Sequence, residues 1–181
     1  MICRSFLSSR ILTLTGLIGA AALSRLMPHP PNFTPIAAMA LFGGACFSEQ
    51  RWAFAVPLAA MILSDLVLGF HGLIPVVYGA FALIGCIGLS LRRRRKAVPI
   101  AGAALASSLV FFVLTNFGVW AMGSSYSKTW DGLVACYVAA IPFFRNTLLG
   151  DAVYTTALFG GLALAEKWVP ALREPRLAPS R

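Results

Sequence analysis

Long apolar stretches alternate with short polar breaks along the chain, and this alternation predicts its helices. The apolar stretches are Ile11–Met27, Pro35–Phe47, Trp52–Phe70, Ile74–Leu91, Val98–Met122 and Thr147–Trp168. A helix needs about 20 apolar residues to cross a hydrocarbon core of about 30 Å. A shorter apolar piece, Leu133–Phe144, precedes the last stretch, and we expect Pro142 to break it. The pattern therefore predicts an all-α integral membrane protein with about six transmembrane helices.

The second apolar stretch is short for a membrane span. As a helix, Pro35–Phe47 reaches about 20 Å, so it must be extended at its ends, stand nearly upright or pack against protein. Four prolines lie among the eight residues before and including its start, Pro28–Pro35, and they exclude helix there. We expect this turn on the non-cytoplasmic side.

The positive charges predict the orientation in the membrane. Arg92–Lys96 is a run of five positive residues, and more follow at the end of the chain. Such runs can bind nucleic acid, but between apolar stretches they mark cytoplasmic segments. With the N-terminus inside and six crossings, the run and the C-terminus both fall in the cytoplasm. We therefore expect one transmembrane domain over residues 1–168 and a basic cytoplasmic tail over 169–181. We expect a bacterial inner membrane, and a first segment that is retained, although Gly19–Ala22 offers a signal-peptidase-like site.

Composition supports a membrane environment and excludes a soluble domain. Of the 181 residues, 59% are hydrophobic and 12% charged, too few charges to cover a soluble surface. The four cysteines, Cys3, Cys46, Cys86 and Cys136, have no CxxC spacing. They are typical of buried thiols rather than of a zinc site or a disulfide framework.

Polar residues inside the apolar stretches gather toward the outer ends of the predicted helices. Asp65 lies about 7 Å below the outer end of its helix, and Asp151 lies at a similar depth from the same side. Asn116 and Trp120 share a face of the fifth segment, and Tyr78 lies one turn into the fourth. Charged residues within membranes are costly and mark functional sites by default. We therefore predict an outward-facing binding pocket, lined or closed by Asp65, His71, Tyr78, Asn116, Trp120, Arg145, Asn146, Asp151, His29 and Asn32.

Two alternatives to a binding pocket remain open for these residues. Arg145 could pair with Asp151 or Asp65 in a buried ion pair that only ties helices together. His29 and His71 could ligate a metal or a metal-bearing ligand, although their spacing is no ligand signature and we assign no metal site.

The first segment carries a row of small residues. Gly16, Ala20 and Ser24 follow one another at spacing four, which lets a second helix approach closely. The second helix belongs either to the same chain or to a partner subunit.

Enzyme functions are less well supported. Asp65 and Asp151 resemble the pair of an intramembrane aspartyl protease, but Leu148 replaces the first glycine of the Gly-x-Gly-Asp motif. The sequence contains no serine-protease, zinc-protease or phosphate-loop motif. Its two histidines are too few for a di-iron centre. We expect no enzyme and no cofactor.

Four motifs resemble a family of uncharacterised bacterial membrane proteins. They are RLMPHPPNFTPIAA at Arg25–Ala38, LSDL at Leu63–Leu66, TNFGVW at Thr115–Trp120 and IPFFRNTLLGD at Ile141–Asp151. That family in turn is similar to the S-components of energy-coupling-factor vitamin transporters. These have six helices and capture a vitamin from outside.

The resemblance implies a function and partners. It implies uptake of a vitamin-like molecule, with Gly16, Ala20 and Ser24 meeting a transmembrane coupling subunit that works with ATPase subunits. Solitary relatives bind cobalamin and hold the cobalt with a thiol near the start of the fourth segment. Here His71-Gly72-Leu73-Ile74 contains no cysteine, so His71 replaces the thiol or the substrate differs. A structural subunit of a membrane complex and an intramembrane hydrolase remain the alternatives.

Overall fold

The chain folds into six α-helices and one short 3-10 helix. The computed structural model describes the backbone of residues 2–173 and the side chains of residues 9–173. No strand occurs in this part of the chain. The elements are α1 (Ile2–Ser24), α2 (Ile36–Cys46), α3 (Gln50–Leu68), α4 (Ile74–Ser90), α5 (Ala97–Met122), α6 (Trp130–Trp168) and η1 (Pro170–Leu172). The all-helical class predicted from the sequence is therefore confirmed.

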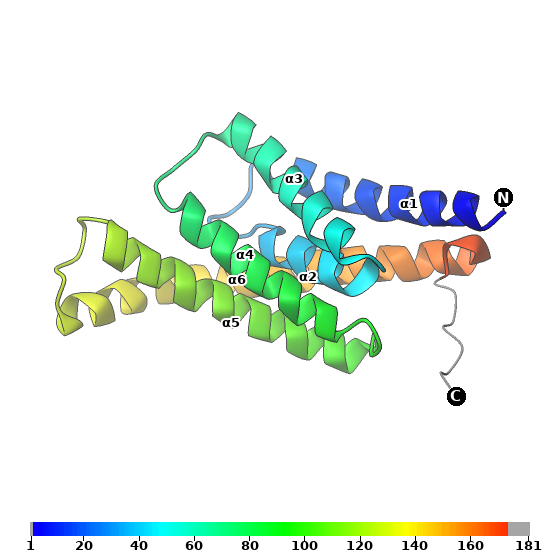
Figure 1. The fold of residues 1–181 in the computed structure, drawn as a ribbon. Helices are drawn as coiled ribbons and strands as arrows, with labels where there is room; N and C mark the ends of the chain where they lie inside the picture. The colour runs from blue at the N-terminus through cyan, green and yellow to red at the C-terminus, as the bar shows by residue number, and fades with distance from the viewer. Residues whose placement is uncertain (1, 174–181) are drawn as a thin grey trace.

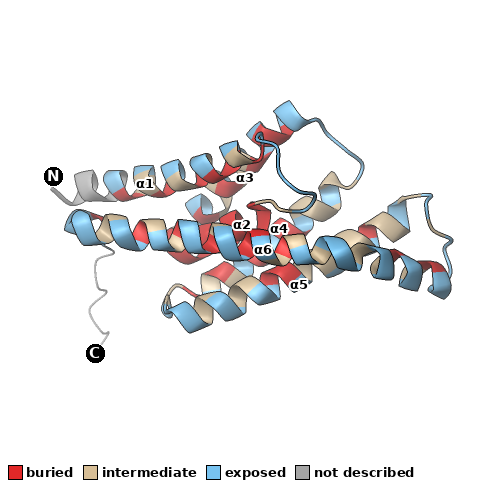
Figure 2. Cartoon of the chain, turned by 180° about the vertical axis from the view of Figure 1, so that it is seen from behind, coloured by how far each residue is buried: buried red, intermediate tan, exposed pale blue. Residues whose placement is uncertain are grey.

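The helices form an elongated bundle with its charged segments at one end. The start of α1, the end of α6 and the loop between α4 and α5 lie together, and the loop between α5 and α6 lies at the opposite end (Figures 1 and 2). The α4–α5 loop carries the basic run Arg92–Lys96. The segments rich in positive charge thus share one end of the molecule.

The short helix α2 forms the centre of the bundle. All of its residues are buried, and it contacts α1, α3, α4, α5 and α6 (Figure 2). Phe42 of α2 meets Phe159 of α6 edge-on, with ring centroids 5.2 Å apart. Of the three possibilities for this segment, packing against protein is the one that the fold uses, because its neighbours cover it on every side.

Fewer helices than expected meet the criteria for a membrane span. Among the described residues, α3, α5 and α6 are long and apolar enough to cross a membrane, judged by length and composition. The described parts of α1, α2 and α4 are apolar but shorter. The apolar helices indicate a helical membrane protein, with three clear candidate spans in the described residues where the sequence predicts about six.

The predicted break at Pro142 is wrong. Residues 130–168 form one helix of 39 residues with Pro142 inside it. Proline removes one backbone hydrogen bond, but membrane helices tolerate it because neighbouring groups satisfy the freed carbonyl. At 1.5 Å per residue, α6 is about 58 Å long, nearly twice the thickness of a hydrocarbon core.

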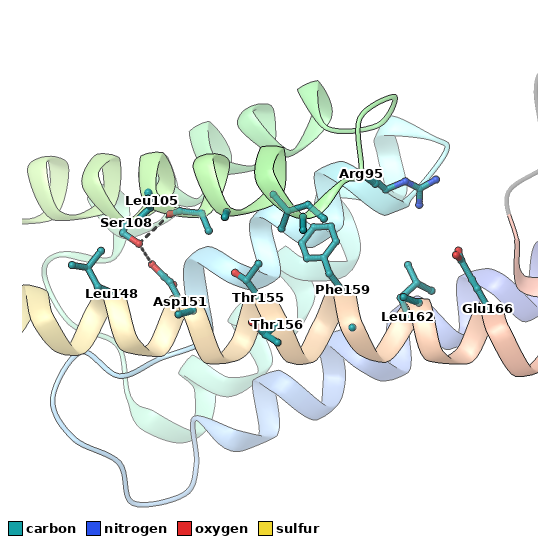
Figure 3. A pocket seen from close by; sticks show the side chains of 17 residues that line it. Arg95, Leu105, Ser108, Leu148, Asp151, Thr155, Thr156, Phe159, Leu162 and Glu166 are labelled. Atoms are coloured by element: carbon teal, nitrogen blue, oxygen red, sulfur yellow. Dashed lines mark hydrogen bonds between the residues drawn. The ribbon is translucent and has the colours of Figure 1, made fainter.

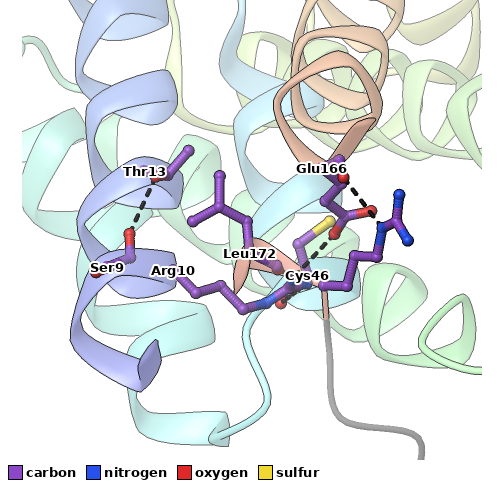
Figure 4. A network of polar contacts seen from close by, with 7 residues as sticks. Ser9, Arg10, Thr13, Cys46, Glu166 and Leu172 are labelled. Carbon is purple, nitrogen blue, oxygen red and sulfur yellow. Dashed lines mark hydrogen bonds and ion pairs between the residues drawn. The ribbon is translucent and has the colours of Figure 1, made fainter. Parts of the chain in front are cut away.

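Residues 169–173, placed in the tail by sequence, pack against the bundle. Leu172 of η1 is buried, and the guanidinium of Arg10 donates a hydrogen bond to its carbonyl (Figure 4). The same guanidinium donates to Glu166 Oε1 at 2.8 Å and to the Cys46 carbonyl at 3.3 Å. One buried arginine therefore joins α1, the end of α2, α6 and η1.

Candidate functional site

A groove between α5 and α6 opens in the described part of the bundle. It has a volume of about 680 Å³ (Figure 3). Most of its wall is apolar, including Ala104 and Leu105 on α5 and Leu148 and Phe159 on α6. Such a cavity falls in the range of about 300–1,000 Å³ that holds small ligands.

A buried carboxylate lies in the wall of this groove. Asp151 is only 3% exposed, and Ser108 Oγ donates a hydrogen bond of 2.5 Å to its Oδ2 atom (Figure 3). Ser108 also approaches the Ala104 carbonyl at 3.1 Å. The single hydroxyl proton favours the shorter contact, since hydrogen bonds to a charged acceptor are the stronger ones. No ion pair to Asp151 is formed within residues 9–173. The groove thus presents an acid without a matching cation.

Thr155 adds an unsatisfied hydroxyl to the same wall. It lies four residues after Asp151 on α6, and four residues is about one helical turn. Thr155 is 5% exposed, and its Oγ1 atom has no hydrogen-bond partner among the described residues. Buried hydroxyls almost always have a partner, so this atom has room for one more contact from within the groove.

The other end of the groove is charged. Glu166 and Arg95 line it there (Figure 3). Glu166 is the partner of Arg10, so its carboxylate is already paired. From Asp151 to Glu166 the groove follows α6 for about 22 Å. Asp151 is therefore distant from this charged end.

Asp65 belongs to a separate polar cluster between α1, α3 and α4. Arg25 Nη2 donates to Asp65 Oδ1 at 2.7 Å, and Tyr78 Oη donates to Asp65 Oδ2 at 2.8 Å. Arg25 Nη1 also donates to Ser64 Oγ. Both oxygens of Asp65 are thus satisfied. The structure brings Asp65 and Tyr78 together as expected from the sequence, but the partner of Asp65 is Arg25 and not Arg145.

Asn116, Trp120 and Asn146 bond to backbone carbonyls. Asn116 Nδ2 donates to Phe112 of its own helix at 2.8 Å, and Trp120 Nε1 donates to Ser127 at 2.9 Å. Asn146 Nδ2 donates to Pro31 at 2.9 Å and so holds the proline-rich turn against α6. These contacts give all three side chains a local role.

The remaining predicted pocket residues face outward. The side chains of Arg145, His29, His71 and Asn32 are exposed. No group of three or more His, Cys, Asp or Glu side chains that could hold a metal occurs among residues 9–173. The predicted pocket residues therefore do not form one pocket. They lie in four places: the Asp65 cluster, the proline-rich turn, the region near the α5–α6 loop and the α5–α6 groove.

The small-residue row on α1 is split between two environments. Gly16 and Ala20 are exposed, and a Cβ atom on Gly16 would meet nothing within 4 Å. Ser24 Oγ instead contacts Tyr154 Oη of α6 at 2.9 Å. Gly16 and Ala20 are therefore accessible to a second helix, whereas Ser24 packs against α6 of the same chain.

Three residues of these clusters were missed in the sequence. Arg25 stands at the end of the first apolar stretch, just before the prolines, where a positive charge is ordinary. Ser108 and Thr155 are common in membrane helices and gave no signal on their own. The adjacent pair Ser107-Ser108, near the middle of a mostly apolar helix, is the one pattern that could have indicated a polar contact there.

Comparison with known proteins gives a family but no activity. The profile of a family of unknown function, DUF6580, matches residues 6–172. No curated protein and no solved structure matches the chain. Because the match covers nearly the whole helical bundle, the chain belongs to the DUF6580 family.

Proposed function

We propose that the protein is the ligand-binding membrane component of an uptake transporter for a small vitamin-like molecule. The ligand lies in the α5–α6 groove. The observation that carries this proposal is the pairing of a cavity of about 680 Å³ with a buried carboxylate and a buried, unpartnered hydroxyl. Binding sites combine apolar walls with a few placed polar groups in this way.

In this proposal the six helices cross the bilayer as a unit, with both termini in the cytoplasm. The gathering of the start of α1, the end of α6 and the basic α4–α5 loop at one end supports this orientation (Figure 1). The α5–α6 loop then lies outside. The short α2 completes the crossing inside a shell of protein rather than in lipid.

Energy for transport comes from other chains in this proposal. The exposed Gly16 and Ala20 on α1 form the contact for a transmembrane coupling subunit, which is joined to ATPases. Small side chains allow the close helix contact that membrane complexes use. The groove suits a drug-sized ligand. A molecule as large as cobalamin is therefore a less favoured cargo than a smaller vitamin.

Calorimetry of the purified protein against a panel of water-soluble vitamins tests the proposal. The informative variant is Ser108→Ala, which removes the hydrogen bond to Asp151. The matched control is Ser107→Ala, because Ser107 is also buried but donates only to the Ala103 carbonyl of its own helix. We expect Ser108→Ala to raise the Kd of the bound vitamin about tenfold, the loss of one hydrogen bond to a charged group. Absence of binding by every vitamin at micromolar concentration would refute the proposal.

A second candidate is a structural subunit of a membrane complex, favoured by the buried Arg25–Asp65 ion pair. Such a pair ties α1 to α3 whether or not a ligand binds. If the protein has this structural role, Asp151→Asn should reduce thermal stability as strongly as Asp65→Asn does. Reduced ligand binding with unchanged stability for Asp151→Asn would exclude it.

An intramembrane aspartyl hydrolase is the least supported candidate. Its two carboxyl groups would share one proton and attack through one water. Asp65 is held by Arg25 and Tyr78, whereas Asp151 is held by Ser108, and the two aspartates share no partner among the described residues.

A further inference from the structure

We infer that the ligand of the α5–α6 groove is an organic cation whose amino group pairs with Asp151. Its apolar body lies along α6 toward Phe159. This inference rests on the proposed function, because it names the chemical class of the molecule that the groove binds.

The charge of Asp151 is the first argument. An acid within a membrane helix is costly unless it is paired, and such residues face a partner or a ligand. The other buried acid, Asp65, has its partner in Arg25 at 2.7 Å. Asp151 has Ser108 as its hydrogen-bond donor and forms no ion pair with a residue in the described chain. A positively charged group of the ligand supplies what Arg25 supplies to Asp65.

Thr155 is the second, independent argument. Thr155 lines the same groove, and its buried Oγ1 atom has no partner within residues 9–173. An ammonium group has three donors. One donor serves Asp151, and a second reaches the hydroxyl one turn farther along the same face of α6. Ser108 keeps the carboxylate oriented from the opposite wall (Figure 3).

The shape and charge of the groove argue against other occupants. An anionic ligand would meet the carboxylate of Asp151, and the arginine that lines the groove, Arg95, lies at the far end beside Glu166 (Figure 3). A lipid acyl chain would cover the apolar wall but would leave Asp151 without a counter-charge and the Thr155 hydroxyl without a hydrogen-bond partner. An amine on an apolar body satisfies both the wall and its polar end.

Photoaffinity labelling with three matched probes tests the charge of the ligand. The probes are phenylbutylamine, phenylbutanol and phenylbutyrate, each carrying a diazirine on the ring, so that size and apolarity stay constant while the charge changes. The full-length protein is held in phosphatidylcholine nanodiscs, and the labelled peptides are identified by mass spectrometry. We expect the amine to label the groove residues of α5 and α6 at least tenfold more than the alcohol or the acid does.

Variants test whether the Asp151 carboxylate is the group that recognises the positive charge of the amine probe. Asp151→Asn keeps the shape of the side chain and removes its charge. We expect it to reduce amine labelling at least tenfold and to leave alcohol labelling unchanged. Thr155→Val should reduce amine labelling by a smaller factor. Ser107→Ala and Asp131→Asn, whose side chains lie outside the groove, should change neither. Circular dichroism and thermal unfolding confirm that each variant is folded.

The outcomes separate this inference from the proposed function. Equal labelling by amine and alcohol, or amine labelling that is indifferent to Asp151→Asn, overturns the cationic ligand while the groove remains a binding site. Preferential labelling by the acid overturns it as well. If none of the probes labels the groove residues, both the cationic ligand and the groove as a binding site are overturned.

Discussion

Gly44 of α2 and Gly88 of α4 lie so close that neither position has room for a side chain. A Cβ atom on Gly44 would lie 2.9 Å from Gly88 Cα and 2.2 Å from the Gly85 carbonyl oxygen. A Cβ atom on Gly88 would lie 2.3 Å from the Leu41 carbonyl oxygen. The obstacles are backbone atoms, which cannot rotate away. The two helices are thus joined by direct contact of their backbones, as in other membrane-helix pairs built on small residues.

Gly44→Ala should therefore lower the free energy of unfolding by about 1–3 kcal/mol, the usual cost of overfilling a packed core. Denaturant unfolding in detergent measures this change. Gly102→Ala on α5 is the control, because a Cβ atom there meets nothing within 4 Å. The control should be as stable as the parent protein or more so, since alanine favours helix over glycine. Equal stability of the two variants would contradict the close contact.

Asp65→Asn should destabilise the bundle strongly. It leaves the buried Arg25 guanidinium without its counter-charge, and breaking one partner of a buried pair costs about 3–5 kcal/mol. Glu49→Gln is the matched control, because Glu49 pairs with Arg51 at the surface. Exposed pairs contribute about 0–1 kcal/mol. Thermal unfolding of both variants measures these effects. A change in stability for Asp65→Asn as small as that for Glu49→Gln would show that the Arg25–Asp65 ion pair does not stabilise the fold.

Arg10→Lys should loosen the end of the bundle that holds η1. Lysine keeps the charge but lacks the planar fork with which Arg10 reaches Glu166, Leu172 and Cys46. We expect amide hydrogen exchange in residues 169–173 to accelerate about tenfold, because η1 loses its anchor. Arg94→Lys in the exposed α4–α5 loop is the control. Unchanged protection of η1 in Arg10→Lys would show that packing of Leu172 alone holds this turn.

The proposed orientation predicts which positions can be labelled from outside. In a cysteine-free version of the chain, Ser125→Cys in the α5–α6 loop should react with a membrane-impermeant maleimide in intact spheroplasts. Arg94→Cys in the α4–α5 loop should react only after permeabilisation. Both positions are exposed in the structure, so access depends on the membrane alone. Labelling of both from the same side would contradict a crossing by α5.

The long apolar stretches predicted most of the fold. The third, fourth and fifth stretches became α3, α4 and α5 with boundaries shifted by at most two residues, because charged or glycine-containing breaks end them on both sides. The last helix was divided wrongly at Pro142. In water a central proline usually ends a helix, whereas here the remaining 38 residues and the neighbouring helices keep α6 continuous.

The site could be predicted only in part. Asp65 and Asp151 were identified because an acid in an apolar stretch is rare, and Tyr78 was expected near Asp65, which its hydroxyl contacts. Their partners depend on which helices are neighbours, and that is a property of the packing. Arg25 reaches Asp65 across 40 residues of sequence, and Ser108 reaches Asp151 across 43. The spacing of apolar and polar residues along a single helix cannot reveal pairs that join two different helices.

The burial of α2 has a consequence for how the chain is assembled. Its 11 residues are too few to be inserted alone as a span of about 20 residues. Its neighbours α4 and α6 are synthesised after it, and both contribute to its surroundings. We therefore expect α2 to reach its final place only after α4 has been synthesised. Completion of the bundle is then a late, cooperative step, and truncation before α4 should leave α1–α3 exposed to quality-control proteases.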